Sequence, residues 1–164
     1  MRMLFARHNI RIYRFLIRFG VDEFLAEDLV SEVFLAVWRH ASRYQGRSQV
    51  STWLFGIARN KANSELRRRR YEQFDEKAES IADPNADPEL TLQTSQRADR
   101  LRKCLTRLSN THREIIDLVY YHEKSINEVA EIIGVPQNTV KTRMFYARSR
   151  LAKLLHQAGV VEVH

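Results

Sequence analysis

Apolar residues recur every three to four positions along most of this chain, which is the spacing of amphipathic helices. In the first 70 residues the pattern predicts a helix that ends at Gly20, a second from about Leu25 to His40, and a third capped by Ser51 or Thr52. No alternation of the strand type interrupts them. The apolar residues on these helices are Leu4, Ile12, Phe15, Leu16 and Phe19, then Leu29, Val30, Val33, Phe34, Val37 and Trp38, and then Trp53, Leu54, Ile57, Ala58, Ala62 and Leu66.

The last part of the chain again predicts helices, with two start signals and one stop signal. Residues 111–114 and 125–128 both have the spacing of a capping box, Thr or Ser followed by Glu at the third position. Gly134 is a natural left-handed end for the short helix that Ser125 opens. The long final helix would turn one apolar face inward, made of Val140, Met144, Ala147, Leu151 and Leu155. The fold class predicted by the whole pattern is all-α.

The segment from Ser125 to Arg150 has the form of a DNA-binding helix-turn-helix. The small Ala130 allows the two helices to cross closely, and Pro136 prevents the first helix from continuing. At 100° per residue, the face opposite the apolar one points outward and could read bases. That face carries Asn138, Thr142, Phe145 and Ser149, flanked by Lys141 and Tyr146, while Lys141, Arg143 and Arg148 are placed for phosphates. The alternative is an ordinary helical hairpin with a polar outer face.

Charge divides the chain into three segments. Residues 1–70 carry 14 Lys and Arg against 6 Asp and Glu, residues 71–95 carry 1 against 7, and residues 96–164 carry 12 against 7. We interpret the middle segment as an acidic linker between two small basic helical domains, because so long a loop is unusual within one domain. The alternative is a solvated surface loop. The overall charge of +7 favours a polyanionic partner.

Several function classes find no support in the sequence. No apolar run approaches the length of a membrane span, so we expect no membrane insertion and a cytoplasmic protein. Cys104 is the only cysteine and falls on the apolar stripe of its helix, while the six histidines are scattered. There is no glycine-rich phosphate loop. We therefore expect no metal, no cofactor and no enzymatic activity.

Two segments of the first domain resemble a known family. One is AEDLVSEVFLAVWR at residues 26–39, which resembles region 2.2 of bacterial sigma factors. The other is STWLFGIARNKA at residues 51–62, which resembles region 2.4, and the C-terminal helix-turn-helix resembles region 4. Two such domains without a region 1.1 or a region 3 are typical of the extracytoplasmic-function (ECF) sigma factors. The resemblance implies a region 2 bundle at 1–70, a linker at 71–95 and a region 4 domain at 96–164.

The resemblance implies that the second helix docks on core RNA polymerase, through the coiled coil of the β′ subunit, and that the β subunit is a partner too. The residues of this chain expected in the polymerase contact are Glu27, Asp28, Ser31, Glu32 and Leu35. An acidic patch within a basic domain suits a protein partner. The alternative is that the acids complement the helix N-terminus, which explains Glu27 and Asp28 better than Glu32.

The resemblance also implies that the loop at 44–50 and the third helix separate the promoter strands at the −10 element and capture an unstacked base. The side chains with suitable chemistry are Tyr44, Arg47, Ser48, Gln49, Arg59, Asn60 and Lys61. Trp53 could be a platform for a base or part of the core. The arginines at 67–70 could grip phosphates or remain solvated at the helix end.

In the second domain the resemblance implies recognition of the −35 element of promoter DNA. The residues expected there are Asn138, Lys141, Thr142, Arg143, Phe145, Tyr146 and Arg148. Val119 and the run Tyr120–His122 depart from the family pattern, which puts the detailed phosphate contacts in question. The family is usually held inactive by an anti-sigma factor, so we expect such a partner.

Two other functions fit parts of the pattern. One is a stand-alone helix-turn-helix repressor or activator, and the other is a helical module that binds RNA or another polyanion. The block at residues 52–62 argues against the first. We expect a sigma factor that binds core RNA polymerase and initiates transcription at specific promoters.

Overall fold

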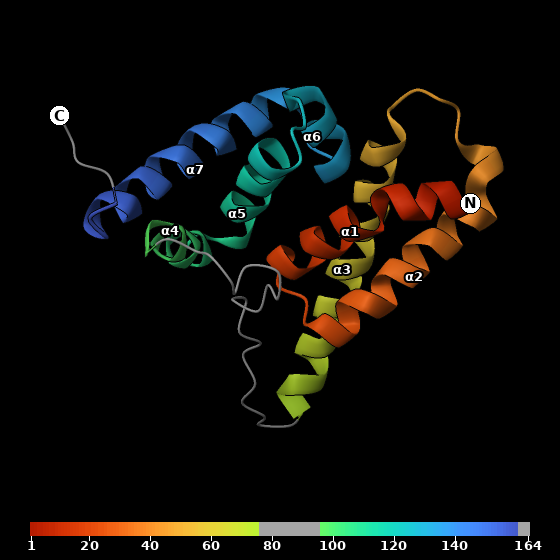
Figure 1. Cartoon of the computed structure of the whole chain (residues 1–164), viewed down its shortest axis with the longest axis horizontal. Helices are drawn as coiled ribbons and strands as arrows, with labels where there is room; N and C mark the ends of the chain where they lie inside the picture. The colour runs from red at the N-terminus through yellow and green to blue at the C-terminus, as the bar shows by residue number, and fades with distance from the viewer. Residues whose placement is uncertain (76–95, 161–164) are drawn as a thin grey trace. The chain divides into compact units, whose positions relative to one another are not determined.

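The computed structural model describes residues 1–75 and 96–160, and the regular structure of these residues is helical throughout (Figure 1). The helices form two compact units. The first contains α1 to α3, and the second contains α4, α5, the π-helical turn η3, α6 as far as Ala130, and α7. The prediction of an all-α fold with two small domains is confirmed.

The first unit is a bundle of three helices that all pack against one another. α1 spans Arg2–Phe19, α2 spans Glu23–His40 and α3 spans Val50–Asp75, with a short 3-10 turn, η1, at Ala41–Arg43 (Figure 1). α1 ends as predicted at Gly20, whose φ of 110° is left-handed. This conformation lets the Val21 amide donate to the Leu16 carbonyl at 3.1 Å, which closes the helix end.

The third helix differs from the prediction at both ends. It begins at Val50, so Ser51 and Thr52 lie inside its first turn, where both are buried, and the predicted cap is wrong. It continues to Asp75, past residue 70 where we predicted the first domain to end. The predicted linker falls mostly at residues 76–95, outside the described residues, and its boundaries stay a prediction.

The core of the first unit contains most of the predicted apolar residues and five that we did not predict, which are Ile17, Val21, Leu25, Ala26 and Phe55. Phe55 is almost fully buried, and its ring meets that of Phe15 edge to face, with centroids 5.2 Å apart. Trp38 was counted among the apolar residues of α2, yet its side chain is 64% exposed. The predicted residues that are buried are Ile12, Phe15, Leu16, Leu29, Val30, Val33, Phe34, Val37, Leu54, Ala58 and Ala62.

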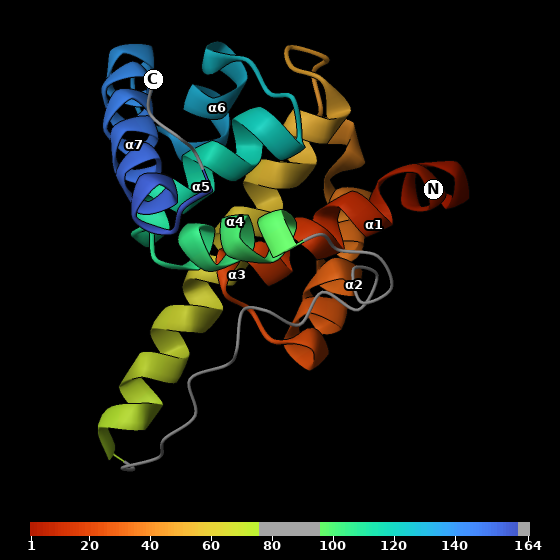
Figure 2. The ribbon, with the colours of Figure 1, turned by 60° about the vertical axis from the view of Figure 1, so that its left-hand side comes forward.

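The second unit is organised around its last helix. α4 spans Gln96–Thr106, α5 spans Asn110–Ile116, α6 spans Ile126–Ile133 and α7 spans Gln137–Gln157. α7 packs along α5 and also against α4 (Figure 2). Val140, Met144 and Ala147 face inward as predicted. Leu154 is fully buried in place of the predicted Leu151 and Leu155, because it continues the Ala147 stripe two turns later.

One of the two predicted capping boxes is present. The Ser125 amide donates to Glu128 Oε2 at 2.8 Å, and the Glu128 amide donates to Ser125 Oγ at 3.1 Å. Gly134 then ends α6 with a φ of 78°, as predicted. The predicted box at Thr111 is wrong, because Ser109 Oγ accepts from the His112 amide and caps α5 instead.

Between α5 and α6 the chain makes a π-helical turn, η3, at Asp117–Tyr121, which the sequence did not predict. The His122 amide donates to the Asp117 carbonyl at 3.2 Å, and Glu123 adopts a left-handed φ of 53°. His122 Nε2 lies 3.2 Å from Asp117 Oδ2, and both side chains are buried. The turn therefore has a polar anchor within the core of the second unit.

Candidate nucleic-acid and partner interfaces

The exposed side of α2 carries all five residues predicted to contact a protein partner. Glu27, Ser31 and Leu35 follow one another at intervals of four residues, which places them on one face of the helix. Asp28 and Glu32 form a second row beside them. The core residues of α2 occupy the opposite side, so Glu27, Asp28 and Glu32 face solvent; these three residues are called the acidic row.

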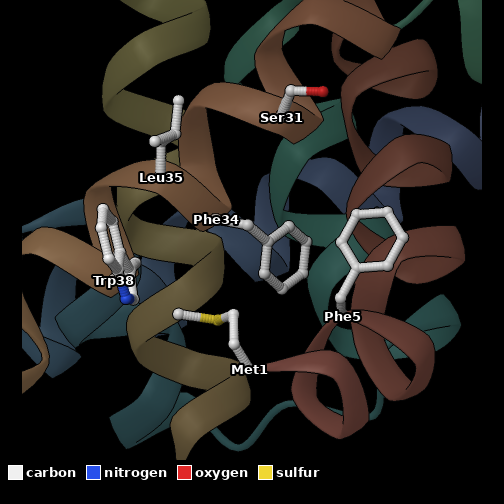
Figure 3. Close-up of a pocket in the computed structure, with 6 residues that line it drawn as sticks. All are labelled: Met1, Phe5, Ser31, Phe34, Leu35 and Trp38. Atoms are coloured by element: carbon white, nitrogen blue, oxygen red, sulfur yellow. The ribbon is translucent and has the colours of Figure 1, made fainter.

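An apolar pocket of about 330 Å³ borders this face (Figure 3). Ser31 and Leu35 line it from α2, together with Phe34 and Trp38, and the start of α1 closes the other side with Met1 and Phe5. The rings of Phe5 and Phe34 meet edge to face in Figure 3, with centroids 5.0 Å apart. The acidic row therefore lies beside an apolar surface that the sequence did not indicate.

Exposed aromatic side chains stand near both ends of the α2 face. Phe24 in its first turn is 86% exposed, and Trp38 near its end borders the pocket. Fourteen residues separate them, about 21 Å along a helix. Large apolar side chains that stand off the core stripe of a helix are a signal that sequence inspection could have used.

An ion pair joins α2 to α3 across the bundle. Lys61 Nζ lies 3.7 Å from Glu32 Oε2. The sequence assigned these two residues to different partners, DNA for Lys61 and a protein for Glu32. The structure brings them together in the free chain.

The loop before α3 is held by an aromatic stack. The rings of Tyr44 and Trp53 lie nearly parallel, at 21°, with centroids 5.0 Å apart. The Tyr44 hydroxyl donates to the Ser48 carbonyl and closes the loop on itself. Trp53 is half-buried, so it is neither a fully buried core residue nor a free platform, because one of its faces already carries Tyr44.

The remaining residues predicted at the −10 site are spread over the loop and one turn of α3. Arg47 and Gln49 are exposed in the loop, and Asn60 is exposed on the helix. Arg59 and Lys61 are partly buried on either side of Asn60. Three consecutive helical residues point over about 200°, so they cannot all face one bound base. Asn60, between them, is the residue best placed to face solvent.

The four arginines near the end of α3 are not equivalent. Arg69 Nη1 lies 2.6 Å from Asp22 Oδ2 and ties α3 to the start of α2. Arg68 pairs with Glu65 and lies 3.4 Å from Glu72. Arg67 and Arg70 are exposed. Half of this cluster is thus engaged within the unit.

Asp22 has two tasks at the junction of α1 and α2. Its side chain accepts from the Leu25 amide at 2.9 Å, which caps α2, and it pairs with Arg69. The hydrogen bond from the Leu25 amide, together with the Arg69 guanidinium, lowers the pKa of Asp22 although partial burial opposes the shift. The negative charge is therefore favoured in the folded state.

The outer face of α7 presents the residues predicted to read bases. Asn138, Lys141, Thr142, Phe145 and Tyr146 are exposed, and Arg143 is partly buried. Phe145 is 69% exposed, and its ring meets that of Tyr146 edge to face at 5.5 Å. The Thr142 hydroxyl donates to the Asn138 carbonyl at 3.0 Å, which leaves its oxygen able to accept from a base.

Across the turn between α6 and α7, Gln137 Nε2 donates to Asn127 Oδ1 at 3.0 Å. Together with the capping box at the start of α6, this bond fixes the first turn of α7 relative to the helix before it. A fixed start is required if the outer face of α7 is to enter a DNA groove in one orientation.

Arg148, predicted to contact phosphate, has an aromatic neighbour that the sequence did not assign. Its guanidinium carbon lies over the ring of Tyr120, 5.7 Å from the centroid. Tyr120 comes from the π-helical turn and is 55% exposed. Its position near α7 depends on the unpredicted turn, so no local sequence signal could have found the contact.

Close to that turn, charged groups are withdrawn from solvent. Burial lowers the pKa of Arg113, and the nearby Asp117 carboxylate opposes the shift. Lys124 is buried too, with its Nζ 4.0 Å from Glu128 Oε1. Charged groups on both sides of the π-helical turn are thus partly or fully withdrawn from solvent.

The described residues contain neither a cluster of metal ligands nor a membrane-spanning helix. Among residues 1–75 and 96–160, no group of three or more His, Cys, Asp or Glu side chains gathers closely enough to hold a metal ion. None of the described helices is both long and apolar enough to cross a membrane.

Comparison with known proteins matches both halves of the chain. Residues 4–72 match the family model for sigma-70 region 2, and residues 104–153 match that for sigma-70 region 4. The chain is similar to the ECF RNA polymerase sigma factor SigL of Mycobacterium tuberculosis, at 32% identity over 98% of this chain and 91% of the relative. It is also similar to the ECF RNA polymerase sigma factor SigM of Bacillus subtilis, at 30% identity over 91% of this chain and 90% of the relative.

Two solved structures share the fold. One is the sigma factor RpoE in complex with the anti-sigma factor NepR from Bartonella quintana, with a TM-score of 0.78 and 29% identity, covering 94% of this chain and 96% of that one. The other is CnrH in complex with the cytosolic domain of CnrY, with a TM-score of 0.68 and 25% identity, covering 94% of this chain and 86% of that one.

Proposed function

Because the chain belongs to the ECF sigma factors of the sigma-70 family, we propose that it directs core RNA polymerase to specific promoters through the surfaces described above. The first unit binds the polymerase and opens the −10 element, and the second unit reads the −35 element. Catalysis of RNA synthesis belongs to the polymerase, so this chain acts where the polymerase acts, in the bacterial cytoplasm.

The polymerase contact lies on the exposed side of α2. Glu27, Asp28 and Glu32 supply negative charge, and the pocket beside Ser31 and Leu35 supplies apolar area. Interfaces that combine an apolar centre with a charged rim are typical of stable protein partners. The partner surface on the β′ subunit should therefore be basic with an apolar centre.

The −10 contact lies on the 44–50 loop and the middle of α3. The Tyr44–Trp53 stack holds the loop in one shape before DNA arrives, which reduces the entropy lost on binding. Arg47, Ser48 and Gln49 lie within or beside the closed loop, and Asn60 offers both a donor and an acceptor to an unstacked base. Arg59 and Lys61 contribute charge toward the DNA backbone.

The −35 contact lies on the outer face of α7. Asn138 and Thr142 can bond base edges, and Phe145 can pack on a thymine methyl in the major groove. Lys141, Arg143 and Arg148 supply the positive charge for phosphates along the groove. Tyr146, beside Phe145, adds a second exposed aromatic ring.

An anti-sigma factor is the third partner. The solved structure of RpoE with NepR is of a sigma–anti-sigma complex, and its sigma chain shares the fold of this chain over nearly its whole length. The exposed apolar surface on α2 would favour aggregation of the free protein, and a bound anti-sigma factor would cover it. The anti-sigma factor and the polymerase should therefore compete for this face.

The proposal is supported by the presence of region 2 and region 4, in order, in one chain, and by exposed expected contact residues in each, such as Glu32 and Asn60 in the first and Phe145 in the second. The test adds the purified protein to core RNA polymerase and to a library of random promoter-length duplexes. We expect the holoenzyme to enrich one bipartite promoter and to give run-off transcripts from it. Failure to bind core polymerase would contradict the proposal, and DNA binding without polymerase would favour the stand-alone regulator.

A further inference from the structure

The contact between Tyr120 and Arg148 joins a residue outside the predicted DNA site to one within it. Arg148 lies on α7, one turn beyond the exposed Phe145, and its guanidinium carbon lies over the Tyr120 ring at 5.7 Å from the centroid. Both belong to the second unit. An arginine over a tyrosine ring at this distance is attracted by the negative face of the ring.

The Tyr120 ring stands on a turn that is itself held in place. The turn is π-helical, a form that is often found at functional sites. Its end is closed by the Lys124 amide, which donates to the Leu118 carbonyl at 3.0 Å. Beneath it, the buried His122 imidazole lies 3.2 Å from the Asp117 carboxylate. The ring therefore has a supported position beside α7.

A cation–π contact leaves the arginine able to bind phosphate. The attraction is between the cationic charge and the face of the Tyr120 ring, and a guanidinium has five N–H donors with which to bind a phosphate. An unstacked arginine on a helix surface would lose much of its rotamer freedom on binding DNA, at a cost of up to about 2 kcal/mol. The ring imposes part of this loss beforehand, in the free protein.

We propose that Tyr120 is a positioning residue for −35 binding, which holds the Arg148 guanidinium over its ring and so directs it to a DNA phosphate. This inference rests on the proposed function, and it adds a residue that the sequence placed outside the contact. Because a phosphate carries no sequence information, Tyr120 sets the strength of −35 binding and leaves the preferred sequence unchanged.

The test uses the full chain assembled with core RNA polymerase, and the promoter duplex that the wild-type holoenzyme selects from a random library. Tyr120→Leu should weaken promoter binding about two- to fivefold, as expected from the loss of an exposed cation–π contact. Tyr120→Phe keeps the ring and should bind like the wild type. The selected −35 sequence should be the same for all three proteins.

A double-mutant cycle distinguishes a positioning role of Tyr120 from a general loss of stability. Arg148→Ala should weaken binding less in the Tyr120→Leu background than in the wild type, because its orientation is already lost. It should also reduce the slope of log affinity against log salt by about one. Arg150→Ala removes the same charge from the same helix, and its effect should be equal in both backgrounds.

Three results would overturn the inference. Equal promoter affinity of Tyr120→Leu and the wild type would show that the ring contributes nothing to DNA binding. A loss in Tyr120→Phe equal to that in Tyr120→Leu would point to the hydroxyl. Independent, multiplicative effects of the Tyr120 and Arg148 variants would remove the coupling. Each of these differs from failure of the proposed function, in which the wild-type holoenzyme selects no promoter at all.

Discussion

Lys61 of α3 and Glu32 of α2 form an ion pair, with Nζ and Oε2 3.7 Å apart, although one is predicted to meet DNA and the other RNA polymerase. The Glu32 side chain is exposed and that of Lys61 is partly exposed, and surface ion pairs contribute about 0–1 kcal/mol to stability. The pair is therefore weak enough for either partner to be given up when polymerase or DNA binds.

Glu32→Gln and Lys61→Gln should separate the two contacts. We expect Glu32→Gln to weaken core polymerase binding roughly fivefold, equivalent to about 1 kcal/mol, while Lys61→Gln leaves it unchanged and lowers promoter binding. Glu23→Gln, on the first turn of the same helix, is the matched control and should not alter either. Anisotropy of labelled protein with core polymerase measures the first effect, and run-off transcription measures the second. Equal losses in both assays for both variants would argue against separate roles.

The pKa of Asp22 predicts how stability depends on pH. Because the folded-state pKa lies below the ordinary value of about 4, the Asp22 carboxylate stabilises the fold fully above that value. The stabilisation is lost as the pH falls through the lowered pKa. Asp22→Asn keeps a capping oxygen but removes the charge, so its deficit should be present at pH 7 and disappear in acid.

Asp22→Ala removes the cap as well and should cost about 1–2 kcal/mol at pH 7. Asp28→Ala removes an exposed carboxylate from the second turn of the same helix; it is the control and should change the free energy of unfolding little. Urea unfolding at several pH values measures all three variants. A deficit of Asp22→Asn that grows toward acid would contradict this account.

Truncation of two phenylalanines of the first unit should affect different properties, stability for Phe55 and polymerase binding for Phe24. Phe55 is almost fully buried against Phe15, so Phe55→Ala should destabilise the unit by about 3–5 kcal/mol. Phe24 is 86% exposed, so Phe24→Ala should change stability by less than about 0.5 kcal/mol. Phe24→Ala should instead weaken polymerase binding, because it removes apolar area from the α2 face that the polymerase contacts. Denaturant unfolding and polymerase binding, measured on the same samples, separate the two effects.

The rate of promoter opening at the −10 element should depend on the hydroxyl of Tyr44. Tyr44→Phe keeps the stack on Trp53 but removes the bond to the Ser48 carbonyl, which is worth about 1 kcal/mol. We expect slower promoter opening with unchanged polymerase affinity. Tyr71→Phe, which removes a hydroxyl from an exposed tyrosine on the same helix bundle, should have no effect. Fluorescence of 2-aminopurine in the non-template strand measures opening, and an unchanged rate in Tyr44→Phe would show that the bond is dispensable.

The features that the sequence predicted well are those decided within a few residues. The end of α1 at Gly20 and the reciprocal cap between Ser125 and Glu128 depend on local backbone geometry and local hydrogen bonds. The outward face of α7 follows from the helical period, and Phe145 is exposed as predicted. The period could also have found Phe55, which lies three residues before Ala58 on the buried stripe.

The features that it missed depend on contacts between distant residues. Thr111 and Ser109 are both able to cap a helix, and the choice of Ser109 follows from where the chain enters α5 after the buried Leu108. Trp38 lines the pocket only because α2 folds back along α1, whose first residues form the other wall. The contact between Tyr120 of the π-helical turn and Arg148 of α7 joins residues that are far apart in the sequence.

Asn60→Ala and Thr142→Ala test whether one chain reads two promoter elements with two different helices. Each holoenzyme is assayed by run-off transcription on the selected promoter and on variants with single base changes in the −10 or the −35 element. We expect Asn60→Ala to lose about tenfold discrimination at the −10 element alone, and Thr142→Ala to lose it at the −35 element alone. The opposite assignment, or loss at both elements by either variant, would contradict the account.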